Sequence, residues 1–519
     1  MKTKKMTAIF CGLVISFMTM NPIYFALSAR IVGFSAMSSG SHYLLIRTVM
    51  EELATRGHEV VMMVGSDHTH SRSTEKIPHK VYQVPFKRGY IKDVVSHAAM
   101  EKNMFQLFRK ISEYFQTSCD SLLKSKELLE DLRNFDLVVY ERGAICGVFV
   151  GELFQIPKVS ILTGIPRPGS SFKVPSPVSY VPMLMTGFTD KMSFLQRVAN
   201  LGAYFVLNLM SEFMIRFYIA PLKTKYNITP EIGIYEALSN DELAIMSGDF
   251  ALDYPQPLLP GQILVGPITI KKPKPLPAEL ESYVNSSGID GFIIVSFGSY
   301  AETLASKDRI DTMAAAFGKL KQKVLWKLKN YIPQALSPNI RVMDWLPQND
   351  LLAHKKVKAF VSHAGHNSLY ESGYHGVPMV GIPLYADQFS NAKKAEDFGF
   401  ALSVNFKTVN SEQLAGIIKQ VLNDPRFKNS AMRISKLMQD KPRLPVETAA
   451  DWIEYVLRHG GARHLRAQVF NIPWYQYYLL DVMAFLVTVV TLIVTMIVLT
   501  CRCFCHLCSK RNGPKSKKE

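Results

Sequence analysis

The hydrophobic residues of this chain alternate between short continuous runs and stretches with helical periodicity. An apolar run, "ARIVGFSA", is followed by "HYLLIRTVMEELATRG", in which apolar residues recur at helical spacing, and then by "HEVVMMVG". The short runs predict buried strands, and the segment between them predicts an amphipathic helix that ends at Gly57. Strands joined by crossover helices form parallel sheets, so the alternation indicates an α/β fold.

The alternation occurs in two series, which predicts two domains. The first series continues through "NFDLVVYE" and "PKVSILTG", and the second runs from "DGFIIVSFGSY" to "VPMVGIPL". Between them "TIKKPKPLPAEL" is typical of a linker, because its prolines cannot sustain a strand ladder. A chain of 519 residues is long enough for two doubly wound domains with a cleft between them. The expected ranges are 30–270 for the N-terminal domain, 271–287 for the linker, 288–445 for the C-terminal domain and 446–481 for a returning helix and juxtamembrane segment.

The two ends of the chain predict a single-pass membrane protein. Residues 1–29 have a basic start and an apolar run interrupted by Asn21 and Pro22, which favours a signal peptide over an uncleaved anchor. Residues 482–500 carry no charge and are long enough to cross a bilayer as a helix. The tail, residues 501–519, has six Lys/Arg against one Glu, and the positive-inside rule places it in the cytosol. We therefore expect type I topology with a luminal body.

The net charge of +17 does not indicate a nucleic-acid partner. Much of the excess lies in the tail and in the first five residues, and neither zinc-finger spacing nor a basic recognition helix is present. The remaining surplus suits acidic ligands or an anionic membrane surface. A homo-oligomer is compatible with the sequence.

Cysteines and sequons agree with a luminal body. Of seven cysteines only Cys119 and Cys146 fall in that body, so one disulfide at most is expected there. "NIT" at Asn227 and "NSS" at Asn285 match glycosylation sequons. Four further cysteines lie in the tail, and we interpret them as palmitoylated or free rather than zinc-binding: Cys501, Cys503, Cys505 and Cys508. Two lysines in "KSKKE", Lys515 and Lys517, resemble a dilysine signal and predict residence in the endoplasmic reticulum.

One uncharged stretch does not fit the strand and helix series. Residues 198–211 are apolar or neutral, but they are too few to span a bilayer. Two interpretations stay open: an ordinary core helix, or an interfacial helix that lines an apolar acceptor site or rests on lipid.

Polar side chains gather where strands of the second series end. After the strand "AFVS", His363, Gly365, Asn367 and Ser368 occupy a turn that leads into a helix. A glycine lets the backbone approach an anion, the amide and hydroxyl can donate hydrogen bonds, and the imidazole could place a proton or positive charge on phosphate oxygens. We interpret this turn as a pyrophosphate site. Glu371 follows three residues after Ser368, so the pair also fits a capping box, S-x-x-E.

Residues on either side of this turn extend the predicted nucleotide site. Upstream, Trp345 could stack on a base and Gln348 could read its edge, although an isolated tryptophan is more often a core residue. Downstream, Asp387 and Gln388 follow the next strand and suit sugar hydroxyls. Neither G-x-G-x-x-G nor G-x-x-x-x-G-K-[ST] occurs, which disfavours a dehydrogenase or a kinase.

Residues 345–388 closely resemble the signature of the membrane-bound animal UDP-glycosyltransferases, the family of the UDP-glucuronosyltransferases. The resemblance extends along nearly the whole chain, through "GSHYLL", "FGS" and both ends, and "WLPQNDLLAH" and "RHGGARHLRA" are similar to the ceramide galactosyltransferase branch. It implies a GT-B fold of two Rossmann-like domains plus a C-terminal transmembrane helix. The N-terminal half would bind the acceptor and the C-terminal half would bind the UDP-sugar, a co-substrate that needs no further cofactor.

The resemblance also implies a role for individual residues. His42 would be the catalytic base, in the loop after the first strand, and Glu141 its carboxylate partner, where the family generally has Asp. Glu371 would bind the ribose, which displaces the capping-box interpretation. The remaining assignments are Trp345 and Gln348 to uracil, His363, Asn367 and Ser368 with nearby Ser299 to the diphosphate, and Asp387 with Gln388 to the transferred sugar.

These roles define a reaction. A neutral imidazole would take the acceptor's proton as the hydroxyl attacks the anomeric carbon, and the carboxylate would stabilise the imidazolium that forms. Because the sequence has no D-x-D carboxylate pair, we expect metal-independent, inverting transfer of a glucuronosyl or neutral hexosyl group to a lipophilic or lipid acceptor. Alternatives are a ceramide-type galactosyltransferase acting on a sphingolipid, a catalytically silent UDP-sugar-binding membrane protein, and a lipid-handling structural protein. The sequence decides neither the sugar nor the acceptor.

Overall fold

The computed structural model describes residues 28–69, 76–101, 104–165, 175–298, 306–329 and 331–511. Nearly all of the expected signal peptide lies outside these residues, as do Lys515, Lys517 and Ser299. The chain forms two compact units, Met1–Leu465 and Arg466–Glu519.

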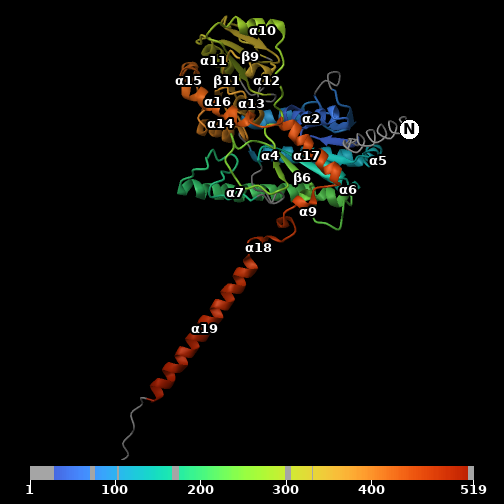
Figure 1. Cartoon of the computed structure of the whole chain (residues 1–519), viewed down its shortest axis with the longest axis vertical. Helices are drawn as coiled ribbons and strands as arrows, with labels where there is room; N and C mark the ends of the chain where they lie inside the picture. The colour runs from blue at the N-terminus through green and yellow to red at the C-terminus, as the bar shows by residue number, and fades with distance from the viewer. Residues whose placement is uncertain are drawn as a thin grey trace, which may run out of the picture. The chain divides into compact units, whose positions relative to one another are not determined.

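The first unit contains two fully parallel sheets (Figure 1). The strands of the first are β1 (Arg30–Phe34), β2 (Glu59–Gly65), β3 (His79–Tyr82), β4 (Leu137–Glu141), β5 (Lys158–Thr163), β6 (Leu243–Ser247) and β7 (Gln262–Leu264), in the order β3-β2-β1-β4-β5-β6-β7. Those of the second are β8 (Phe292–Ser296), β9 (Lys323–Lys327), β10 (Ile340–Met343), β11 (Val357–Ser362), β12 (Met379–Gly381) and β13 (Ala401–Ser403), in the order β10-β9-β8-β11-β12-β13. The predicted α/β fold with two doubly wound sheets is confirmed.

Helices connect the strands and cover both faces of each sheet. In the first half they are α2 (Gly40–Thr55), α3 (Tyr90–Glu101), α4 (Met104–Lys124), α5 (Lys126–Leu132), α6 (Ile145–Phe154), α7 (Phe194–Met214), the π-helix η2 (Ile215–Ile219), α8 (Ala220–Lys225) and α9 (Ile234–Ser239). In the second half they are α10 (Ala278–Asn285), α11 (Lys307–Phe317), α12 (Gln348–Leu352), α13 (His366–Tyr374), α14 (Gln388–Asp397), α15 (Ser411–Asn423), α16 (Pro425–Gln439) and α17 (Pro445–His459). Helix α10 occupies the second part of the segment expected to be a linker.

Neighbouring residues of a central strand are buried on opposite faces of the first sheet. Ile31 packs with α2 in one hydrophobic cluster, and Val32 packs with α6 in another; both side chains are fully buried. Because successive side chains of a strand point to opposite faces, a strand covered on both sides needs a continuous apolar run rather than alternation. This is why "RIVGF" is hydrophobic throughout.

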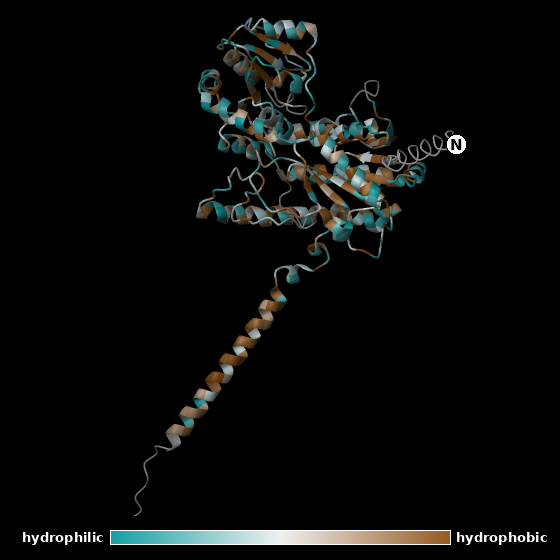
Figure 2. Ribbon diagram, in the orientation of Figure 1, coloured by the Kyte–Doolittle hydropathy of each residue, from teal (hydrophilic) through white to brown (hydrophobic). Residues whose placement is uncertain are grey.

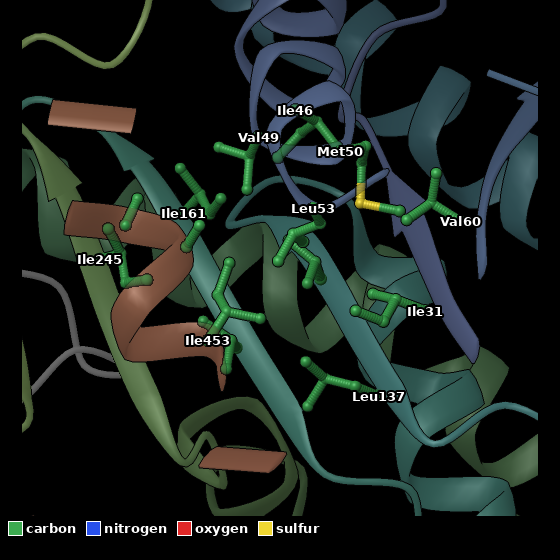
Figure 3. Close-up of a cluster of buried hydrophobic side chains, with 14 of the residues drawn as sticks. Ile31, Ile46, Val49, Met50, Leu53, Val60, Leu137, Ile161, Ile245 and Ile453 are labelled. Atoms are coloured by element: carbon green, nitrogen blue, oxygen red, sulfur yellow. The ribbon is translucent and has the colours of Figure 1, made fainter. Parts of the chain in front are cut away.

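Helix α17 returns from the second sheet to complete the core of the first. Figure 3 shows Ile453 of α17 among side chains of α2 and of the first sheet, including Leu53 and Ile161. The guanidinium of Arg56, the C-cap residue of α2, fixes this contact, since Nη1 lies 2.7 Å from Asp451 Oδ1 and 3.1 Å from Glu454 Oε2. The first sheet is therefore covered by helices from both the start and the end of the first unit, α2 and α17.

The sequence left the pairing of two cysteines open, and the structure joins them. Cys119 of α4 and Cys146 of α6 form a disulfide with a Cα–Cα distance of 5.1 Å. The bond links two helices on one face of the first sheet. Such a bond is typical of proteins that fold in an oxidising compartment.

The second unit consists mainly of one long apolar helix. After α18 (Trp474–Tyr477), α19 runs over Leu480–Arg511, and Figure 2 shows it as predominantly hydrophobic. Within its segment Leu480–Cys508 an 18-residue window has a mean hydropathy of 2.9, and a helix as long as that segment exceeds the roughly 30 Å of a bilayer's hydrocarbon core. Among the described residues, no three or more His, Cys, Asp or Glu side chains are grouped to hold a metal ion.

Candidate active site

His42 lies in the first turn of α2 rather than in the loop after β1. The backbone of Gly40, with a φ of 74°, turns directly into the helix, so the expected loop ends earlier than the sequence indicated. The side chain of His42 is one-third exposed, and its Nδ1 contacts the Oε1 atom of Glu141. Nε2 is then the ring nitrogen left to meet an acceptor hydroxyl.

Glu141 is held from three directions. It is the last residue of β4 and is buried, and its Oε2 accepts a hydrogen bond from the Ala36 amide at 2.9 Å. Its Oε1 contacts His42 and lies 3.4 Å from Thr163 Oγ1. Burial lowers the pKa of His42, but the charge and hydrogen bond of Glu141 outweigh it and raise the pKa above the usual value. The longer side chain of Glu, compared with Asp, reaches the imidazole.

Two residues assigned to the nucleoside and one assigned to the diphosphate meet in one cluster. Gln348, the first residue of α12, donates from Nε2 to Glu371 Oε2 at 2.6 Å and to Ser368 Oγ at 3.3 Å. Trp345 lies three residues before Gln348 in the sequence, and its side chain is 65% exposed, whereas that of Trp326 is fully buried. The interpretation of Trp345 as a core residue is therefore wrong. An exposed indole is free to stack on a base.

The capping-box interpretation of Ser368 and Glu371 is wrong. Helix α13 begins at His366 with Gly365 as its N-cap, and no side chain caps it. Ser368 is already inside the helix, and the carboxylate of Glu371 bonds to Gln348 rather than to a free backbone amide. Burial raises the pKa of Glu371 to about 7. A half-buried carboxylate whose described partner is one amide group suits a ligand with hydroxyl donors.

This raised pKa predicts pH-dependent nucleoside binding. Uridine, which carries the ribose diol without phosphates, should bind roughly tenfold more tightly at pH 8 than at pH 6, because only the ionised carboxylate of Glu371 accepts both hydroxyls strongly. Calorimetric titration across this range tests the expectation. In Glu371→Gln the dependence should vanish, and a wild-type affinity that does not change with pH would contradict the proposed ribose contact.

The turn before α13 holds the residues assigned to the diphosphate. Gly365 must be glycine, because a Cβ there would lie 2.5 Å from the Nε2 atom of buried His363. Asn367 is the second residue of α13, so its amide and the free N–H groups of the helix start share one region. Burial and the nearby charge of Lys327 lower the pKa of His363 to about 4. His363 is therefore neutral at pH 7, and the expectation that it carries a positive charge is corrected; it can still donate from N–H.

The positive charge at this site belongs to Lys327, which sequence reasoning missed. Its side chain is largely buried at the end of β9, and Nζ donates to the Gly298 carbonyl at 3.2 Å and lies 5.4 Å from the ring centroid of Trp345. Lys327 follows the apolar run "VLW" and belongs to no motif. The available signal was a charged residue at the carboxyl end of a buried parallel strand, where ligands bind in such sheets.

The residues assigned to the sugar begin α14. Ala386 adopts a left-handed φ of 52°. Asp387 is then the N-cap residue of α14, although its side chain makes no capping hydrogen bond and instead accepts from Asn391 Nδ2 at 2.7 Å. Gln388 Oε1 accepts the backbone amides of Leu384 and Tyr385 at 2.8 and 3.1 Å. Burial raises the pKa of Asp387, and its charge acts electrostatically on His42. The structure thus brings His42, the predicted base, close enough to Asp387, a predicted sugar residue, for their charges to interact.

A buried carboxylate ties the first sheet to helices α13 and α14. Asp253 follows β6, and its carboxylate contacts Lys394 Nζ of α14 and accepts from the Tyr370 hydroxyl of α13. All three side chains are buried. Although burial by itself would raise the pKa of Asp253, Lys394 and Tyr370 hold it below the usual value. We name these three residues the Asp253 clasp.

Breaking the clasp is expected to destabilise the body. Asp253→Asn leaves the Lys394 ammonium buried without its counter-charge, which should lower the free energy of unfolding by about 3–5 kcal/mol. The control is Glu59→Gln, whose ion pair with Arg30 lies at the surface, with side chains 57% and 34% exposed, and should contribute about 1 kcal/mol or less. Denaturant unfolding of both variants provides the measurement. Equal losses in the free energy of unfolding would show that the Asp253 clasp stabilises the body no more than a surface ion pair does.

Comparison with known proteins decides the family. A family model described as "UDP-glucoronosyl and UDP-glucosyl transferase" matches residues 34–516. The chain belongs to this family. UDP-glucuronosyltransferase 2C1 of Oryctolagus cuniculus is 36% identical over 502 residues, covering 91% of this chain and 98% of the relative. The 2-hydroxyacylsphingosine 1-beta-galactosyltransferase of Homo sapiens is 33% identical over 468 residues, covering 88% and 85%.

Solved structures agree at the level of the fold. The calicheamicin glycosyltransferase CalG4 superposes with a TM-score of 0.58 at 17% identity, covering 83% of this chain and 99% of that one. The fold is therefore GT-B, as the resemblance implied. As a member of the UDP-glucuronosyltransferase family the chain is a UDP-glycosyltransferase, and its C-terminal apolar helix is consistent with the membrane anchor of that family.

Proposed function

We propose that this glycosyltransferase transfers a hexosyl group, with inversion, from a UDP-sugar to a hydroxyl of a lipophilic acceptor. The observation that carries the proposal is the pairing of His42 with buried Glu141, electrostatically coupled to Asp387 of the other sheet. Nε2 of His42 takes the acceptor's proton while the acceptor oxygen bonds to the anomeric carbon. The bond from that carbon to the diphosphate breaks, and UDP leaves with the electron pair. Glu141 balances the charge of the imidazolium.

The departing UDP gains negative charge, and three groups could stabilise that charge. These are the N-terminus of α13, the N–H of neutral His363 and the ammonium of Lys327. Preorganised donors and cations at a developing charge lower the barrier most when they are shielded from water. Lys327 and His363 are both largely buried, which supports this role.

The sugar and the acceptor are tested together. Purified full-length protein is incubated with UDP-glucuronate, UDP-galactose, UDP-glucose or UDP-N-acetylglucosamine, each with a ceramide or a simple phenol. We expect one donor to give a glycoside of a hydroxyl acceptor. The relative named as a galactosyltransferase of 2-hydroxyacylsphingosine supports the ceramide-type alternative, which UDP-galactose with ceramide would reveal. UDP binding without any product would instead support a catalytically silent protein.

We also propose that the body faces the lumen of the endoplasmic reticulum. The disulfide of Cys119 and Cys146 and the exposed sequon residues Asn227 and Asn285 suit an oxidising, glycosylating compartment.

The proposed retention signal gives a direct test. Replacing Lys515 and Lys517 together with serine should move the protein from the reticulum to later secretory compartments, because the tail then lacks its dilysine pattern. Immunofluorescence with compartment markers measures the change, and loss of endoglycosidase H sensitivity on Asn227 or Asn285 provides a second readout. An unaltered distribution would show that these lysines are not what retains the protein.

A further inference from the structure

A small cavity lies at the carboxyl edge of the first sheet. The segments that follow β1 and β4, the end of β2 and one side of α4 bound it. Its volume of about 30 Å³ accommodates a group of the size of water, ammonium or methyl, but not an aromatic ring. Cys119 and Cys146 also line it, so their disulfide joins two helices of its wall. We call it the Ser118 cavity, after the residue of α4 that contributes a hydroxyl to the wall.

Ser118 brings a buried polar atom without a partner to this cavity. Its side chain is only 7% exposed, and its Oγ has no hydrogen-bond partner among the described residues. Ser112 of the same helix is also buried, but its Oγ donates to the Phe108 carbonyl at 2.8 Å. Because a buried hydroxyl is normally hydrogen-bonded, the hydroxyl of Ser118 is available to a ligand in the cavity.

A buried carboxylate lies directly behind the wall. Asp67 follows β2 and is fully buried, and its Oδ2 accepts from Ser38 Oγ at 2.8 Å and from the Tyr114 hydroxyl at 2.9 Å. Ser38 and Tyr114 both line the cavity. The Oδ1 atom of Asp67 has no hydrogen-bond partner in the part of the chain that the structure describes. Two neutral hydroxyl groups bring no positive charge, although a buried carboxylate is normally paired with one.

The two hydroxyl groups direct their protons toward Asp67. An ionised carboxylate can only accept hydrogen bonds, and each hydroxyl has a single proton. Burial and the charge of Asp67 raise the pKa of Tyr114, so its hydroxyl keeps that proton. Ser38 and Tyr114 therefore present lone pairs to the cavity. Phe34 and Phe115 complete the wall with aromatic rings, whose faces attract cations.

We propose that the Ser118 cavity binds the ammonium group of an acceptor that carries a protonated amine in addition to its reacting hydroxyl. An ammonium group donates hydrogen bonds and is positively charged, so it complements both the lone pairs of Ser38 and Tyr114 and the charge of Asp67. A neutral hydroxyl would complement only the lone pairs. The inference rests on the proposed function, in which the acceptor's hydroxyl lies at His42.

The cavity is close enough to the proposed base for one acceptor to reach both. Ala36 lines the cavity, and its amide donates to Glu141 Oε2 at 2.9 Å. Gly143, another lining residue, is exposed and follows Glu141 by two positions. The ammonium group would therefore lie about one residue away from the carboxylate that is proposed to orient His42. A short acceptor can place its hydroxyl at the imidazole and its amine in the cavity.

The test compares three phenols that differ only in the end group of a two-carbon side chain. The end group is ammonium in tyramine, hydroxyl in tyrosol and methyl in para-propylphenol, and homologues one methylene shorter and longer allow for the distance from the cavity to the base. Calorimetry on the full-length protein, saturated with UDP in detergent at neutral pH, measures their binding without transfer.

Two variants remove features of the cavity, and a third is the matched control. Asp67→Asn removes the charge and keeps the shape, and Ser118→Ala removes the unpaired hydroxyl. The control is Ser112→Ala in the same helix, because the hydroxyl of Ser112 is already bonded to Phe108.

We expect the ammonium compound of the best-fitting length to bind about tenfold or more tightly than its methyl counterpart. This ratio should fall to about one in Asp67→Asn and by about threefold in Ser118→Ala, and it should keep its wild-type value in Ser112→Ala. Ser118→Ala breaks no hydrogen bond among the described residues. A lower ratio in that variant therefore reports contact with the ligand and not a loss of folding.

A wild-type ratio near one at every length would overturn the proposal, as would an unchanged ratio in Asp67→Asn. Equal binding of tyrosol and tyramine would make the cavity a site for a neutral hydroxyl, which also overturns the ammonium assignment. Transfer assays with the same compounds test the proposed function separately. Sugar transfer to para-propylphenol without a preference for the amine would refute only the cavity proposal, and a preference in binding without any transfer would refute only the proposed function.

Discussion

Replacing His42 with alanine should lower the rate of sugar transfer by about 10²- to 10⁴-fold and leave UDP binding nearly unchanged. The imidazole is the only proposed proton acceptor, and general-base catalysis contributes on this scale. His42 belongs to α2 of the first sheet, whereas the residues proposed to hold UDP belong to the second. Losing a group used only in the transition state reduces kcat without weakening the ground-state complex.

The measurement is kcat at saturating donor together with calorimetric UDP affinity. His42→Gln is the matched control for packing, because its amide can still reach Glu141 but cannot accept a proton. Both variants should be equally inactive. Near-native turnover in either one would mean that another group in the cleft is the base.

Replacing Glu141 with glutamine should give the second-largest loss, up to about 10⁴-fold. An amide can hold the ring of His42 but cannot balance the charge of the imidazolium. Glu141 also raises the pKa of His42. The base works only when neutral, so activity falls as pH drops through that pKa. Without the carboxylate the pKa falls, and the acid limb of the kcat/KM profile should shift to lower pH.

This shift separates a positioning role from simple loss of folding. A variant that is merely less stable would lose activity at all pH values and keep the position of the acid limb. Glu141→Asp adds a second control, since the shorter carboxylate keeps the charge but cannot easily reach both the Ala36 amide and His42. It should retain more activity than Glu141→Gln, with the acid limb near its wild-type position. A limb that stays fixed in Glu141→Gln would contradict the assignment.

Local patterns were sufficient to predict the parallel sheets and the edge of the sheet at which Gln348 lies. Continuous apolar runs such as "RIVGF" report burial on both faces, and the ends of neighbouring parallel strands meet at one edge of a sheet. The role of Gln348 at the base followed from such a position, whereas the role of Glu371 at the ribose was implied only by the family resemblance. The contact between Gln348 and Glu371 depends on the order of the strands in the second sheet.

Contacts between distant segments could not be predicted in this way. Asp253 and Lys394 are 141 residues apart, and neither lies in a pattern that distinguishes it from a surface charge. The same holds for Lys327, whose burial depends on the loop at Gly298. Helix α7 buries only one of its residues, so the interpretation of this uncharged segment as a core helix is wrong. The exposure of α7 could not be decided from the sequence, which left a core helix and an interfacial helix open, because an apolar periodicity is the same in both. The charge state of His363 followed only once its burial was known.

The return of α17 to the first sheet sets the order in which the protein can mature during translation. Ile453 and Val456 belong to the same core as Ile31, so that core stays incomplete until the ribosome has released the entire second sheet. Domains generally fold as they emerge, N-terminal part first. Here the earlier half must wait for the later one, and exposes an apolar face to chaperones while it waits. A shortened chain should therefore end after residue 465, the limit of the first unit, and not after the second sheet.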